Sequence, residues 1–88
     1  RVSSVLFVCV RNGGKSQMAE GLMRAAAGDA AAASSAGTRP GTGLNALSVE
    51  SLREVGVDIS GGVPRALTAD LVAAADLVVT LGAEAHVE

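Results

Sequence analysis

A short apolar run, a glycine-containing loop and a helical repeat open the chain, and this order limits the possible folds more than any other feature. Residues 5–8 are continuously apolar, as in a strand that is buried on both faces of a sheet. Residues 9–15 form a polar segment with two adjacent glycines. Apolar residues then recur at helical spacing from Ser16, and Gly28 is placed to end that helix. A strand, a tight loop and a helix in succession predict the first unit of a parallel α/β sheet.

Three further segments continue this alternation. Residues 30–36 form a run rich in alanine and serine, which predicts a second strand although these residue types have low β-propensity. Residues 47–55 are amphipathic at helical period, and Thr68 is placed to begin a short helix. Residues 76–81 predict a third buried strand. The order predicts an open, doubly wound sheet, and such sheets bind ligands at the carboxyl ends of their strands.

Composition and charge exclude several classes of protein. The 88 residues are enough for one domain, and 49% hydrophobic with 18% charged residues allow that domain to bury a core. The formal net charge of -2 argues against nucleic-acid binding, and no apolar run has the length of a membrane span. Because Cys9 is the single cysteine, no internal disulfide can form, and we expect a soluble cytoplasmic protein. His86 has no partner in a metal-ligand pattern, so no bound metal is expected.

The loop between the first strand and the helix is predicted to carry the chemistry. Its glycines allow successive backbone N–H groups to converge on one anion, and the helix N-terminus adds partial positive charge. Lys15 adds a full charge, a thiol in that field loses its proton more readily, and Ser16 can donate a hydrogen bond to the thiolate. We therefore predict that Cys9, Lys15 and Ser16 are catalytic. The predicted oxyanion-binding residues are Val10, Arg11, Asn12, Gly13, Gly14, Lys15 and Ser16.

A nucleotide-binding phosphate loop is a competing interpretation of the same segment, since it also ends in Gly-Lys-Ser. That motif needs a glycine at the position of Cys9. Nucleotide hydrolases also place an Asp at the end of a later apolar strand to help hold Mg²⁺, whereas residues 77–81 are followed by Gly82. Both differences disfavour a nucleotide hydrolase.

Three ordered segments resemble the low-molecular-weight tyrosine phosphatase and arsenate reductase superfamily. The matching residues are Val5, Leu6, Phe7, Val8, Cys9, Val10, Asn12, Ser16, Met18, Ala19, Glu20, residues 35–38 and residues 56–60. The resemblance implies a flavodoxin-like open parallel sheet with helices on both faces. Residues 1–88 would then be the N-terminal part of a single phosphatase-like arsenate reductase domain, truncated after its third strand. Relatives continue with a further strand, a final helix and a loop whose Asp is the general acid.

One departure from the family pattern indicates the substrate. The resemblance places Lys15 where the family has an Arg. An Arg offers a planar fork to the oxygens of a transferring phosphoryl group, whereas a Lys is a point charge, which disfavours phosphomonoester hydrolysis. The Gly-Gly-Lys-Ser-Gln-Met loop and residues 43–51 are instead similar to the actinobacterial arsenate reductases that use the small thiol mycothiol.

The cysteine content points to the same branch. Thioredoxin-coupled relatives relay oxidation through further cysteines, one of them near the end of the third strand, and residues 80–84 of this chain contain none. A thiol from outside must therefore resolve an arsenic adduct on Cys9. The resemblance implies an arsenate–mycothiol transferase in which Cys9 attacks arsenate and mycothiol displaces it, or mycothiol attacks arsenate held beside Cys9. A mycoredoxin-type protein would release arsenite afterwards, with mycothiol as co-substrate and no resident cofactor.

The resemblance also implies a supporting set and leaves two alternatives. Asn12, Glu20 and Ser35 match positions that stabilise the loop in relatives. One alternative is a low-molecular-weight protein-tyrosine phosphatase, which would hydrolyse a generic aryl phosphate. The other is a non-catalytic, oxyanion-binding remnant, which would bind phosphate or arsenate without turnover and have an unreactive Cys9.

Overall fold

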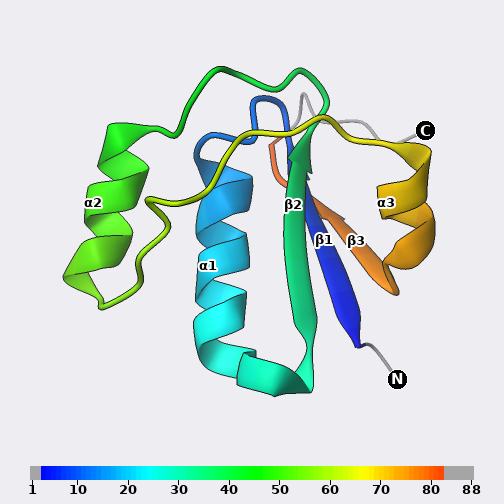
Figure 1. Cartoon of the computed structure of the whole chain (residues 1–88), viewed down its shortest axis with the longest axis horizontal. Coiled ribbons are helices and arrows are strands. Elements are labelled where there is room, and N and C mark those ends of the chain that lie inside the picture. Colours follow the sequence, from blue (N-terminus) through cyan, green and yellow to red (C-terminus); the bar gives the residue numbers. More distant parts are fainter. Residues whose placement is uncertain (1–2, 83–88) are drawn as a thin grey trace.

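The computed structural model describes residues 3–82, so His86 and the rest of residues 83–88 lie outside the described part. Three parallel strands form one sheet with helices on both sides (Figure 1). In chain order the elements are β1 (Ser4–Cys9), α1 (Lys15–Ala27), the 3-10 turn η1 (Gly28–Ala30), β2 (Ala32–Gly37), α2 (Ala46–Glu54), α3 (Ala69–Ala74) and β3 (Leu77–Thr80).

The sheet has the order β2-β1-β3, so β1 is paired along both edges. Phe7 in β1 lies opposite Ser35 in β2 and Val79 in β3. Helix α1 lies on one side of the sheet and α3 on the other, and α2 lies beyond α1 (Figure 1). This arrangement confirms the predicted α/β class with helices on both faces and three parallel strands.

Two predicted strands differ from the observed ones. The third strand covers Leu77–Thr80 and is not buried as predicted, because among the described strands β3 pairs only with β1, and Leu77 and Thr80 are exposed. The second strand begins at Ala32 and not at residue 30, because Gly28–Ala30 continue α1 as a 3-10 turn. Gly28 has a φ of 55°, a positive value that glycine adopts without a steric cost. The predicted start of the third helix is confirmed, since the side chain of Thr68 accepts a hydrogen bond from the backbone N–H of Leu71.

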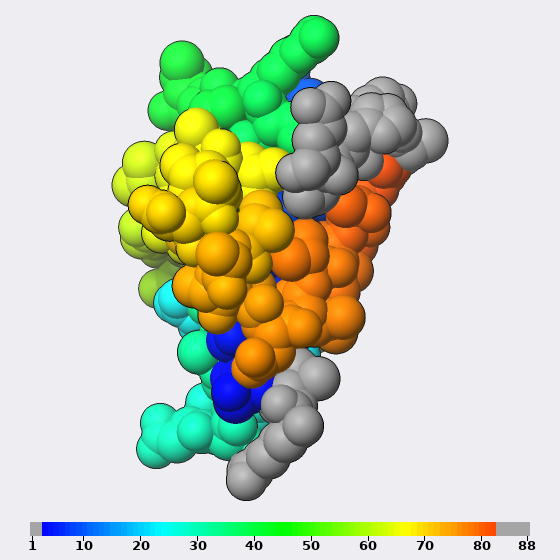
Figure 2. Space-filling view, turned by 90° about the vertical axis from the view of Figure 1, so that its right-hand side faces the viewer, coloured from blue at the N-terminus to red at the C-terminus, as the bar shows by residue number. Residues whose placement is uncertain are grey.

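The core lies between the sheet and α3. Leu6, Val8 and Ala36 are fully buried there, and partly buried side chains of α3 and its flanking residues pack against them. Figure 2 shows this side, where α3 and β3 leave little of the blue β1 visible. Because no large aromatic side chain takes part, the core depends on close approach of small aliphatic groups.

On the side of the sheet that carries α1, a glycine allows α1 and the segment after α2 to pack closely. A Cβ atom at Gly21 of α1 would lie 2.5 Å from the Cγ2 atom of Ile59. The absence of that Cβ lets the segment after α2 pack directly on α1, where Ile59 and Leu52 are both buried. Within residues 3–82, no helix has the length and hydropathy needed to cross a bilayer.

The three strands point their carboxyl ends at the same edge of the sheet, and the loops after β1 and β2 are bonded together there. Thr38 donates its backbone N–H to the carbonyl oxygen of Cys9 at 3.0 Å, and Arg39 donates to that of Val10 at 2.8 Å. A Cβ atom at Gly37 would lie only 2.6 Å from the carbonyl oxygen of Val10. The end of β2 therefore serves as a support on which the loop after β1 rests.

Candidate active site

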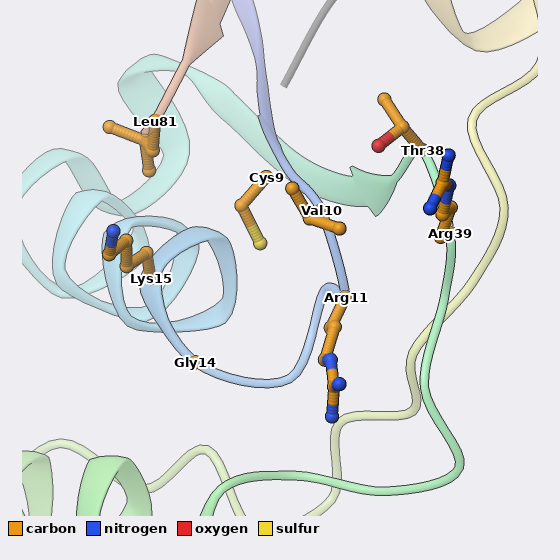
Figure 3. A pocket seen from close by; sticks show the side chains of 8 residues that line it. All are labelled: Cys9, Val10, Arg11, Gly14, Lys15, Thr38, Arg39 and Leu81. Atoms are coloured by element: carbon orange, nitrogen blue, oxygen red, sulfur yellow. The ribbon is translucent and has the colours of Figure 1, made fainter. Parts of the chain in front are cut away.

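A cavity of about 740 Å³ opens at this edge of the sheet (Figure 3). Its lining residues are Cys9, Val10, Arg11, Gly14, Lys15, Thr38, Arg39 and Leu81. Five of them belong to the segment that the sequence singled out, and the other three follow β2 and β3. The remaining predicted residues, Asn12, Gly13 and Ser16, are buried in the loop.

Cys9 lies at the end of β1 with hydrogen-bond partners around its sulfur. The residue is only 6% exposed, and its thiol is free. The Sγ atom is 2.8 Å from the Oγ atom of Ser16, and it accepts the backbone N–H of Asn12 at 3.2 Å. Both neighbours stabilise a thiolate if they donate, and the thiolate is the nucleophilic form of cysteine.

The orientation of the Asn12 amide determines which way the Ser16 hydroxyl donates. The side-chain oxygen of Asn12 accepts the backbone N–H of Arg65 at 2.9 Å, and a backbone N–H can only donate. The amide nitrogen must therefore face Ser16, and it donates to the Oγ atom at 2.7 Å. Since Ser16 accepts from Asn12, its single hydroxyl hydrogen is left for the sulfur of Cys9.

The other two predicted supporting residues, Glu20 and Ser35, contact each other and reach the loop through Arg65. The Ser35 hydroxyl donates to the Glu20 carboxylate at 2.6 Å, and the same carboxylate pairs with Arg24 at 2.9 Å. The Nε–H of Arg65 donates to the Ser35 carbonyl at 2.9 Å. Sequence reasoning missed Arg65, because it lies in an irregular segment with no periodic signal.

Gln17 and two residues of the rim were also missed. Gln17 is 5% exposed and donates to Asn12, and its only signal in the sequence was a polar residue on the inner face of α1. Thr38 and Arg39 line the cavity because they directly follow the end of β2. The carboxyl end of the second strand was therefore a usable signal.

The cavity is positively charged along its rim. Arg11 and Arg39 lie on one side and Lys15 on the other (Figure 3). No Asp or Glu is among the described lining residues. Gly14 is the N-cap residue of α1 and has no side chain, so no capping side chain accepts the N–H groups of the first helical turn. Such a helix start attracts an anion through both its N–H groups and its dipole.

Metal binding has no candidate cluster in the described part of the chain. Among residues 3–82, no group of three or more His, Cys, Asp or Glu side chains is placed to hold a metal ion. The groups that line or support the cavity are the Cys9 thiol, the Ser16 hydroxyl, backbone N–H groups of the loop and the cationic side chains of the rim.

Comparison with known sequences assigns the chain to a protein family. The family described as low molecular weight phosphotyrosine protein phosphatase matches residues 4–88. An arsenate reductase of Bacillus subtilis is 41% identical over 81 residues, which are 92% of this chain and 58% of that protein. The chain thus spans little more than half the length of this curated relative.

Solved structures agree with the sequence comparison. A thioredoxin-dependent arsenate reductase of Corynebacterium glutamicum has a TM-score of 0.88 and 42% identity, covering 94% of this chain and 42% of that chain. A tyrosine phosphatase of Erwinia amylovora has a TM-score of 0.86 and 29% identity, covering 96% of this chain and 56% of that chain. With the matching fold, loop and family model, this chain belongs to the low molecular weight phosphotyrosine protein phosphatase family.

Proposed function

We propose that this chain acts in thiol-dependent arsenate reduction, with residues 9–16 as the arsenate-binding loop and Cys9 as the nucleophile. The observation that supports this most directly is the pair of donors at the Cys9 sulfur, the Ser16 hydroxyl and the Asn12 N–H. They lie beneath a cavity with three cationic side chains on its rim. A tetrahedral oxyanion in the loop would place its central atom in front of the sulfur.

The chemistry follows from these groups. The Cys9 thiolate attacks arsenic(V), one As–O bond breaks, and the oxygen leaves as water after protonation. Lys15 and the loop N–H groups offset the negative charge of the remaining oxygens, in the manner of an oxyanion site. When the Cys9 sulfur later departs, the Ser16 hydroxyl stabilises it again as a thiolate. No atom of the chain is consumed in this cycle.

The thiol that completes the reaction is proposed to come from outside. An external thiolate attacks arsenic, its S–As bond forms and the Cys9–As bond breaks. A second thiol then attacks the sulfur of the released adduct, giving a disulfide and arsenic(III) as arsenite. We propose mycothiol as the first thiol and a mycoredoxin-type protein as the second, in the cytoplasm. Two observations support this. Cys9 is the only cysteine of the 88 residues. After β3, where thioredoxin-coupled relatives carry a further cysteine, this chain has the cavity residue Leu81 and then Gly82.

The second candidate is phosphotyrosine hydrolysis, which the family match and the Erwinia amylovora phosphatase favour. Two observations disfavour it. Lys15 cannot form the bidentate contact that an Arg would offer to a phosphoryl group. Phe7 is the only aromatic residue of the 88, and it lies in β1 and does not line the cavity, so no described ring can stack on a tyrosyl substrate.

The deciding experiment measures arsenate-dependent thiol oxidation by the full-length natural protein. Mycothiol with mycoredoxin, thioredoxin with its reductase, and no thiol are compared, and aryl phosphate hydrolysis is measured in parallel. We expect turnover with mycothiol that is abolished in Cys9→Ser, whereas Lys15→Arg should raise the aryl phosphatase rate relative to arsenate turnover. Turnover with thioredoxin alone would contradict the proposed thiol. Aryl phosphate hydrolysis without arsenate turnover would identify a phosphatase.

A third possibility is an oxyanion-binding protein without catalysis, and alkylation distinguishes it. In that case the wild-type protein binds arsenate, but Cys9 reacts with iodoacetamide no faster than a free cysteine in a small peptide. The proposed function requires faster alkylation, and it requires bound arsenate to slow that reaction. Mass spectrometry of the residue 9–16 segment measures both rates.

A further inference from the structure

Gln17 is a buried amide that the proposed chemistry does not use. It is the third residue of α1 and is 5% exposed. Its Nε2 group donates to the carbonyl oxygen of Asn12 at 3.2 Å, to the side-chain oxygen of Asn12 at 3.4 Å and to the carbonyl oxygen of Val63 at 3.3 Å. One side chain therefore connects the reactive loop to a segment 46 residues further along the chain.

The residue that Gln17 holds has an unusual backbone. Asn12 has a φ of 54°, and no other non-glycine residue in the described part of the chain has a positive φ. It is also fully buried, so its carbonyl oxygen has no access to water. Asn tolerates this conformation better than most residues, but surrounding contacts must still maintain it. Two of the contacts that do so come from Gln17.

Holding the Asn12 carbonyl also fixes the next peptide group. In a trans peptide the C=O and the N–H point in opposite directions, and the chain has no cis peptide bond within residues 3–82. With the Asn12 carbonyl directed at Gln17, the N–H of Gly13 is directed away from Gln17. The other peptide group of Asn12 supplies the N–H that donates to the Cys9 sulfur, so the residue that Gln17 contacts also contacts the nucleophile.

The segment that carries Val63 is shaped to receive the Gln17 side chain. A Cβ atom at Gly62 would lie 2.6 Å from the Oε1 atom of Gln17. The bare backbone at that position leaves room for the amide between the two segments. Arg65, in the same segment, donates its backbone N–H to the Asn12 side-chain oxygen. Gln17 and Arg65 thus both donate a hydrogen bond to the side-chain oxygen of Asn12.

We propose that Gln17 is a positioning residue that keeps the Asn12 backbone and amide in the orientation that Ser16 and Cys9 require. Without its N–H donor, the Asn12 amide loses one of the contacts that hold its oxygen away from Ser16. If the oxygen of Asn12 turned toward Ser16, the Ser16 hydroxyl would donate to that oxygen and no longer to the Cys9 sulfur. The inference rests on the proposed function only for its catalytic consequence, because the reactivity of Cys9 can be measured without arsenate.

The test compares Cys9 alkylation by iodoacetamide and phosphate binding in the full-length protein. Gln17→Met removes the donor at similar length, and Gln17→Glu keeps the shape but presents carboxylate oxygens to three acceptors. We expect alkylation to be slower by about tenfold in both variants, with a matching loss of phosphate affinity. The control is Leu52→Ala, which removes a side chain that is 4% exposed on α2 and lies outside the loop.

Thermal unfolding shows whether the loss is specific. The control should lower Tm at least as much as the Gln17 variants and leave the alkylation rate within about twofold of wild type. The proposal is overturned if Gln17→Met alkylates at the wild-type rate, if Gln17→Glu behaves as wild type, or if Leu52→Ala slows alkylation equally. If arsenate turnover is absent but Cys9 alkylation depends on Gln17, the proposed function fails and this inference stands.

Discussion

The backbone N–H of Arg65 donates to the side-chain oxygen of Asn12 at 2.9 Å, across 53 residues of sequence. This bond directs the amide nitrogen of Asn12 at Ser16, which accepts a hydrogen bond from it. The Ser16 hydroxyl hydrogen is therefore left to donate to the Cys9 sulfur. The reactive loop is therefore not defined by its own sequence alone. A segment that follows α2 sets the direction of its hydrogen bonds.

Asn12→Asp tests this direction directly. A carboxylate cannot donate to Ser16, so the Ser16 hydroxyl should turn toward it and leave the Cys9 sulfur with one donor fewer. We expect turnover to fall by about a hundredfold, as for the loss of a donor in an oxyanion site. The control Asn45→Asp makes the same chemical change at the start of α2, where an Asp caps a helix as well as an Asn. Equal loss in both variants would refute the role of the Asn12 amide.

Gly37→Ala should dislodge the loop from its support. The added Cβ would lie 2.6 Å from the Val10 carbonyl oxygen, and neither atom can move aside by a side-chain rotation, because the Cβ is fixed to the backbone and the oxygen is part of it. We expect a loss of about 1–3 kcal/mol in the free energy of unfolding, measured in urea, together with weaker phosphate binding. Gly43→Ala is the matched control, because a Cβ there meets nothing within 4 Å. Normal phosphate binding in Gly37→Ala would show that the loop does not depend on this contact.

Asp76 should contribute to stability in a pH-dependent way. The backbone N–H and hydroxyl of Ser3, followed by the N–H of Ser4, donate to its carboxylate and lower its pKa from the ordinary value of 3.8. Since the pKa is lowered in the folded state, the stabilisation is present above about pH 4 and is lost as the pH falls through the lowered value. The difference in unfolding free energy between wild type and Asp76→Asn should be constant above about pH 5 and shrink in acid. A difference that does not change with pH would contradict this.

The cationic rim should govern the approach of anions more than the chemical step. Arg11 and Arg39 line the cavity, and both are exposed. Replacing either with Ala should lower kcat/KM for arsenate by a few-fold at low salt, with the effect much reduced at about 0.5 M salt because exposed charges are screened. Arg53→Ala, on α2, provides the control. If kcat falls and KM is unchanged at all salt concentrations, the arginines act in the chemical step instead.

The local parts of the fold were predictable, because apolar runs and helical spacing act over a few residues. The β1 strand, the loop and α1 follow the sequence pattern closely, and Thr68 begins its helix as expected. The start of β2 was not predictable, since alanines give no signal that separates a 3-10 turn from a strand.

The candidate site divides in the same way. The closeness of Cys9 and Ser16 followed from a tight loop before a helix, and their Sγ–Oγ distance is 2.8 Å. The contacts of Gln17 with Val63 and of Arg65 with Asn12 depend on how α2 and the chain after it return across α1. No periodicity in the sequence encodes contacts over such separations, so only the folded chain reveals them.

The central place of β1 in the sheet has a consequence for how this scaffold can change. The carbonyl oxygen of Val8 accepts the N–H of Leu81, and that of Cys9 accepts the N–H of Thr38. The end of the strand is therefore hydrogen-bonded on both edges. Opening β1 requires breaking both ladders, and its amides should be among the last to exchange with deuterated solvent. The sulfur thus lies at the end of a strand that is hydrogen-bonded along both edges, whereas Arg39 and Thr42 lie on the loop after β2, and loops accept substitutions more readily than central strands. New substrate preferences can therefore arise by altering the rim while the nucleophile stays in place.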